Sequence, residues 1–157
     1  LGLLYIRKRL AAGDVRTRLR ETFRSALKAC KLLEGDDALA GKLSFDTSSF
    51  EFSISNRLLA PNEDATLEEV REVLTDFIGW LFGASEVVLE RDSRPRSLFL
   101  VRVKVPEEVA VDTLLARLGP SPALLLASQI LLIFFLFDKI RSISFFIKTS
   151  VAGFKLF

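Results

Sequence analysis

The chain has 157 residues, enough for one domain with its own core, and a formal net charge of +2. It contains one Cys and no His, which excludes His-based catalytic triads, His metal sites, and any zinc site, iron–sulfur site or disulfide formed within the chain. The usual glycine-rich nucleotide motifs are also missing from the sequence, so no cofactor is predicted.

Charge is unevenly distributed along the chain. Residues 1–31 hold nine Lys and Arg against two acidic residues, whereas residues 32–122 hold nine against seventeen. A basic arm on an acidic body indicates an anionic partner. The lone cysteine favours a reducing compartment, so we expect a cytoplasmic protein.

The first regular element is predicted over residues 15–34. Its apolar residues recur every three to four positions, as on one face of a helix, and Gly35 follows as a helix stop. The uncertain N-terminal extension, residues 1–14, allows two interpretations. It is either sequence upstream of the natural start, or a native lead into the helix with Asp14 as its N-cap.

Two short segments then alternate apolar and polar residues. Residues 43–45 and 50–54 flank a polar stretch at 46–49, a pattern typical of a β-hairpin with a short turn. The loop 57–62 follows, broken by proline. The two leucines of this loop, Leu58 and Leu59, either pack into the core or form an exposed contact patch, and we expect them to pack into the core.

The strongest helical pattern begins at Thr66 and ends before Gly83. Residues 85–90 and 98–105 alternate again and predict a second hairpin with its tip at 91–96. A last helix is predicted from Pro106 to Leu118.

The predicted order is therefore α-β-β-α-β-β-α, with a domain at residues 15–119. It indicates an α+β two-layer sandwich, in which helices cover one face of a four-stranded, mainly antiparallel sheet.

Residues 120–157 form an apolar C-terminal tail of different composition, rich in Phe, Ile and Leu. Residues 123–137 are uncharged and close to the length that spans a bilayer, which favours a membrane segment. The same composition is typical of translated AT-rich DNA, which favours non-native sequence. Both interpretations stay open.

Two clusters of basic residues are the candidate contacts for an anionic partner. The first is a stripe at four-residue steps on the first helix, and the second is the tip of the second hairpin. Their members are Arg16, Arg20, Arg24 and Lys28 in the stripe, and Arg91, Arg94 and Arg96 at the tip. Such residues can bind phosphate or carboxylate groups, and they can equally be ordinary solvated surface. The stripe has no aromatic residue on its polar side on which a base could stack.

These patterns favour a small, non-enzymatic intracellular interaction or regulatory module with a protein partner. One alternative is a nucleic-acid-binding domain that uses the basic first helix and the Arg-rich tip. Another is a membrane-tethered domain anchored by residues 123–137.

Overall fold

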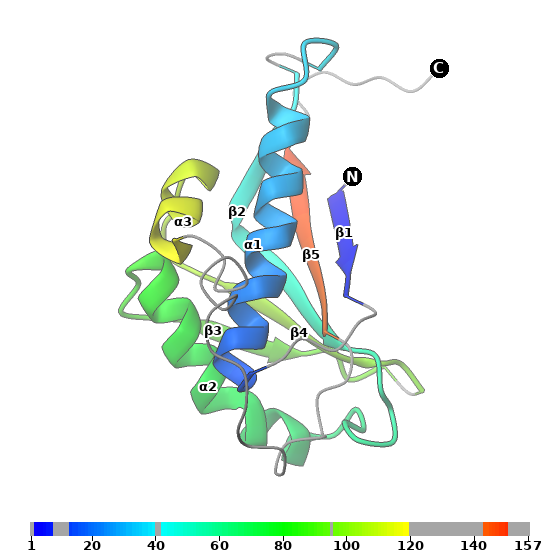
Figure 1. Ribbon diagram of the computed structural model, residues 1–157. Coiled ribbons are helices and arrows are strands. Elements are labelled where there is room, and N and C mark those ends of the chain that lie inside the picture. Colours follow the sequence, from blue (N-terminus) through cyan, green and yellow to red (C-terminus); the bar gives the residue numbers. More distant parts are fainter. Residues whose placement is uncertain (1, 8–12, 40–41, 95, 120–142, 151–157) are drawn as a thin grey trace.

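The structure is a computed structural model that describes residues 2–7, 13–39, 42–94, 96–119 and 143–150. Its elements in chain order are β1 (Gly2–Ile6), α1 (Val15–Glu34), β2 (Ser44–Ile54), α2 (Asp64–Phe82), β3 (Val88–Arg91), β4 (Phe99–Lys104), α3 (Val111–Leu118) and β5 (Ile143–Ser150). Figure 1 shows α1, α2 and α3 on one face of the sheet. The predicted α+β class is confirmed.

The sheet has five strands in the order β1-β5-β2-β4-β3, and all neighbouring strands are antiparallel. The predicted count of four strands is therefore wrong. Two of the strands come from outside residues 15–119: β1 from the predicted N-terminal extension, and β5 from the predicted tail. β5 lies between β1 and β2, so it joins the first strand to the rest of the sheet.

The predicted hairpin at 43–54 is wrong, because these residues form the single strand β2. The carboxylate of Asp46 accepts hydrogen bonds from the backbone and hydroxyl of Ser48, at 2.9 and 2.5 Å. This local bonding coincides with a shift of register between Phe45 and Phe50 in the pairing with β5. The polar stretch that looked like a turn is thus an irregularity within one strand.

Two helices begin elsewhere than predicted. α2 starts at Asp64, and Thr66 is already inside it and buried. α3 starts only at Val111, because the segment before it is bonded to β2. There Val109 N donates to Thr47 Oγ1 at 3.0 Å, and Thr47 Oγ1 donates to Val109 O at 2.7 Å.

The core is formed between the helices and the sheet. Phe23 of α1 makes edge contacts with Phe50 of β2 and Phe77 of α2, with ring centroids 5.5 and 5.2 Å apart. Among residues 2–7, 13–39, 42–94 and 96–119, the buried hydrophobic residues lie between Leu19 and Leu118. The domain boundary near residue 119 stays a prediction.

The candidate membrane segment, residues 123–137, lies outside the described residues, so the tether stays a prediction. In the part of the chain that the structure describes, no helix combines the length and the apolar character needed to cross a membrane.

Candidate functional site

Arg24 of the predicted basic stripe is a structural residue. It is only 3% exposed, although arginine is rarely buried unless it is paired. Its guanidinium donates to the carbonyls of Leu118, at 2.7 Å, and Gly119, at 3.1 Å, and also pairs with Glu21. Arg24 therefore caps the C-terminal end of α3 and holds it against α1, and its contact with an external anion stays a prediction.

Arg91 has a similar structural role at the predicted tip. Its Nε donates to a carboxylate oxygen of Asp64 at 2.8 Å, and its Nη1 donates to the backbone carbonyl of Asn62 at 3.0 Å. The side chain is thereby hydrogen-bonded to the first turn of α2 and to the loop before it. Its contact with an external anion also stays a prediction.

Arg94 is exposed but already has an anionic partner. Asp92, 4% exposed, accepts hydrogen bonds from Arg94 Nε at 2.8 and 3.0 Å and from the Arg94 backbone N–H at 3.1 Å. Arg102 Nη2 lies 3.4 Å from the same carboxylate. The hydrogen bonds from Arg94 are the main reason that the pKa of Asp92 is lowered to about 2. The tip is therefore organised around an ionised aspartate.

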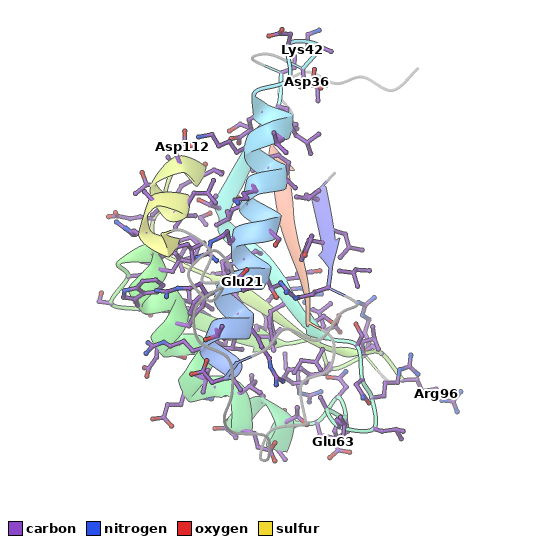
Figure 2. The ribbon with its side chains drawn as sticks, in the orientation of Figure 1. Glu21, Asp36, Lys42, Glu63, Arg96 and Asp112 are labelled. Atoms are coloured by element: carbon purple, nitrogen blue, oxygen red, sulfur yellow. The ribbon has the colours of Figure 1, made fainter. Side chains whose placement is uncertain are left out.

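Beside this tip, the loop 57–62 presents an exposed leucine. Leu58 is 94% exposed, so the expectation that it packs into the core is wrong. Its neighbour Arg57 is exposed as well, and so is Arg96, whose backbone has a φ of 60°. In Figure 2, Arg96 projects outward at this end of the molecule. We call Arg57, Leu58, Arg94 and Arg96 the loop–tip surface.

The remaining arginines of the stripe line a groove between the start of α1 and the last turns of α2. It is a hollow of about 260 Å³ lined by Asp14, Arg16, Thr17, Arg20, Phe77 and Trp80, and we call it the α1–α2 groove. The Cζ atom of Arg20 lies 4.9 Å from the centroid of the Trp80 ring, a cation–π contact.

Asp14 lines the groove at the beginning of α1. Its carboxylate accepts the backbone N–H of Thr17 at 2.8 Å, which confirms Asp14 as the N-cap. Hydrogen bonding with Thr17 is also the main reason that the pKa of this carboxyl is lowered. The ionised side chain is thus part of the helix cap.

Trp80 is the functional candidate that sequence reasoning missed. The polar side of α1 carries no aromatic residue of its own, and the ring beside its arginines comes from α2. One signal was present: Val73 and Trp80 are seven residues apart, so they share one side of the helix. They are 37% and 43% exposed, and they form an apolar strip on a surface helix.

Lys28, the last member of the stripe, lies near the other end of α1. It is exposed and lines a second hollow of about 320 Å³ with Lys31, Leu32 and Gly35. Lys31 forms an ion pair with Asp112 of α3. Lys28 is therefore separate from the α1–α2 groove.

The structure keeps the two basic clusters apart. Arg91 contacts α2 at Asp64, whereas Arg20 contacts it at Trp80. Sixteen residues of helix at 1.5 Å each place these contacts about 24 Å apart. The clusters are consequently two surfaces at opposite ends of α2.

The lone thiol is part of the core. Cys30 is fully buried, and burial raises its pKa to about 12, so the thiol stays protonated. Among the described residues, no group of three or more Cys, Asp and Glu side chains is placed to hold a metal ion.

Comparisons with known proteins add no relative. No protein-family model matches the chain, and neither a curated protein nor a solved structure shows significant similarity to it.

Proposed function

We propose that this chain is a non-enzymatic interaction or regulatory module that binds a partner protein through the α1–α2 groove. The observation that carries the proposal is the exposed ring of Trp80, with the Arg20 guanidinium held against it beside a hollow. A surface tryptophan next to a hollow supports a contact role, because Trp and Arg dominate the energetic centres of protein interfaces.

The chemistry of the groove indicates what the partner offers. Arg16 and Arg20 present two guanidinium groups, while the carboxylate of Asp14 is engaged by the helix it caps. Guanidinium groups bind carboxylates through paired hydrogen bonds, and the indole ring of Trp80 offers an apolar contact. The partner segment is therefore expected to carry an acidic residue close to an apolar one.

Trp80 is the chain's one tryptophan, so its fluorescence reports on the groove alone. We would select displayed random peptides on the full chain and then titrate the enriched peptides while following this emission. Enrichment of peptides that combine Asp or Glu with an apolar residue, and that shift the Trp80 emission, is the expected result.

Calorimetry on variants tests whether these peptides occupy the groove. Replacing an anchor residue weakens binding by about tenfold or more, so we expect this loss for Trp80→Ala and a smaller one for Arg20→Ala. Arg71→Ala is the matched control, because Arg71 is exposed on α2 but nine residues from Trp80, on the opposite side of the helix. Equal affinity for wild type and Trp80→Ala would contradict the proposal.

Nucleic-acid binding is the second candidate function. Trp80 supports it, because one exposed aromatic ring beside Arg16 and Arg20 is a minimal site for a stacked base and its phosphates. Binding of single-stranded oligonucleotides that weakens steeply with salt and is lost in Trp80→Ala would favour this function over the first. Absence of binding at low salt, with the fold intact, would remove it.

A further inference from the structure

We infer that the loop–tip surface docks on an anionic lipid membrane, with Leu58 inserted among the headgroups. This surface lies at the other end of α2 from the groove, so the inference does not depend on the proposed function. It rests on three features: a rigidly held exposed leucine, basic side chains around it, and a convex shape.

The exposure of Leu58 is fixed by the bonding of its loop. The backbone N–H groups of Leu58 and Leu59 both donate to the Asn56 side chain, at 3.1 and 3.3 Å. Further along the loop, Asn62 Nδ2 donates to the carbonyl of Asp92 at 2.8 Å and to the hydroxyl of Ser97 at 2.7 Å. The loop and the hairpin tip are therefore bonded into one unit that holds an apolar side chain in water.

The charges around this leucine suit an anionic surface. Arg57, Arg94 and Arg96 are exposed, whereas the carboxylate of Asp92 is buried beneath them. Figure 2 shows Arg96 at the outer edge of this end, with the acidic Glu63 set back toward α2. The exposed arginines, with Arg96 at the outer edge, therefore give this end of the molecule positive surface charge.

The shape of this end favours a membrane over a folded partner. In Figure 1 the loop before α2 and the turn between β3 and β4 project side by side from one end of the sheet. A protruding leucine needs a pocket on a protein partner, but it can enter the headgroup region of any bilayer. Each arginine close to an anionic bilayer then strengthens binding by roughly fivefold.

A fluorescent probe at residue 58 tests the inference in the full chain. Cys30 is fully buried, so a thiol-reactive, polarity-sensitive dye labels an introduced cysteine selectively. We would label Leu58→Cys and, as a matched control, Leu32→Cys, because Leu32 is 76% exposed on α1. Both proteins are mixed with phosphatidylcholine vesicles, with and without phosphatidylserine, that carry a lipid-bound quencher.

The expected result is specific to one dye position and one lipid. On vesicles with phosphatidylserine, the emission of the dye at residue 58 shifts to the blue and is quenched. The emission of the dye at residue 32 stays that of a dye in water. Arg57→Glu combined with Arg96→Glu weakens binding to these vesicles by about 25-fold or more, since two contacts of roughly fivefold each are lost. Lys28→Glu, which changes an exposed charge on α1, leaves it unchanged.

Three outcomes would overturn the inference. The first is a dye at residue 58 that remains in water on every vesicle, and the second is an equal response from both dye positions. The third is binding to soluble poly-glutamate that depends on Arg57 and Arg96 while the dye at residue 58 stays unquenched on vesicles. That last result would assign the surface to an acidic protein partner.

Discussion

The two ends of α2 use the same residue type for two purposes. At its C-terminal end, Arg24 caps α3, and Arg117 donates to the carbonyl of Leu81 at 2.8 Å, while Arg20 lies at the surface on Trp80. At its N-terminal end, Arg91 holds the loop, while Arg96 is exposed. At each end, one arginine donates hydrogen bonds to backbone carbonyls, while another a few residues away in the sequence is open to a partner.

The apolar residue at each end marks the difference between them. Trp80 lies in a hollow between two helices, where a side chain of a partner can be enclosed. Leu58 stands on a convex loop with nearly its whole surface in water. The first arrangement suits a protein segment and the second a flat lipid surface, so the two ends should lose different activities when they are changed.

The largest expected effect is from Phe77→Ala, which removes a buried ring from the core between α1 and α2. Phe77 is fully buried against Phe23, and its ring centroid is 5.8 Å from that of Trp80. Loss of a buried phenyl ring should lower the free energy of unfolding by about 3–5 kcal/mol. Chemical denaturation measures this, with the partly exposed Val73→Ala as control. A loss below about 1 kcal/mol would show that α2 does not pack as described.

The next largest expected effect is a difference in stability loss between Arg24→Ala and Arg20→Ala, two variants of the same basic stripe. Arg24→Ala leaves the carbonyls of Leu118 and Gly119 without their donor and Glu21 without its ion pair. We expect it to lower the free energy of unfolding by about 2–4 kcal/mol, in the range for breaking a buried, hydrogen-bonded charge. Arg20→Ala removes an exposed cation–π contact and should cost about 1 kcal/mol or less. Equal decreases in the free energy of unfolding, measured by denaturation, would contradict the distinction between the buried, hydrogen-bonded Arg24 and the surface Arg20.

The sequence predicted those elements whose evidence is local. The long apolar period of residues 15–34 identified α1 to the residue, and alternation identified β3 and β4 as a hairpin. β1 is a short apolar run with no alternation, and among the described strands it pairs with β5, more than a hundred residues away. No local pattern could therefore reveal it. The turn predicted within β2 was wrong, because the Asp46 side chain accepts the backbone N–H and the hydroxyl of Ser48 inside a strand.

The candidate site was less predictable, since the structural partners of its side chains are distant in sequence. Arg24 and the Gly119 carbonyl are 95 residues apart, and Arg91 and Asn62 are 29 apart. Four-residue spacing placed Arg16, Arg20 and Arg24 on one side of α1 but could not say which of them another helix would cover. These arginines differ in how deeply they are buried, and burial depends on tertiary packing that the local spacing does not reveal.

The smallest expected effect is confined to the loop–tip end and appears at low pH. The pKa of Asp92 is lowered to about 2 in the folded chain, chiefly by hydrogen bonds from Arg94, against an ordinary value of 3.8. A carboxyl whose folded pKa is depressed stabilises the fold above its unfolded pKa, and this contribution is lost as pH falls toward the folded value. Wild type should therefore lose more stability than Asp92→Asn when pH falls from 3.8 to about 2.

The variant comparison is needed because other carboxyl groups titrate in the same interval. Subtracting the two pH profiles of unfolding isolates Asp92, and carbon NMR of its carboxyl group measures the pKa directly. The pH profile of Trp80 fluorescence should be the same in both proteins over this interval, because Asp92 and Trp80 belong to opposite ends of α2. A carboxyl that titrates near 3.8 would show that Arg94 is not bonded to Asp92 in solution. Arg94 would then contribute its full charge to the loop–tip surface at every pH.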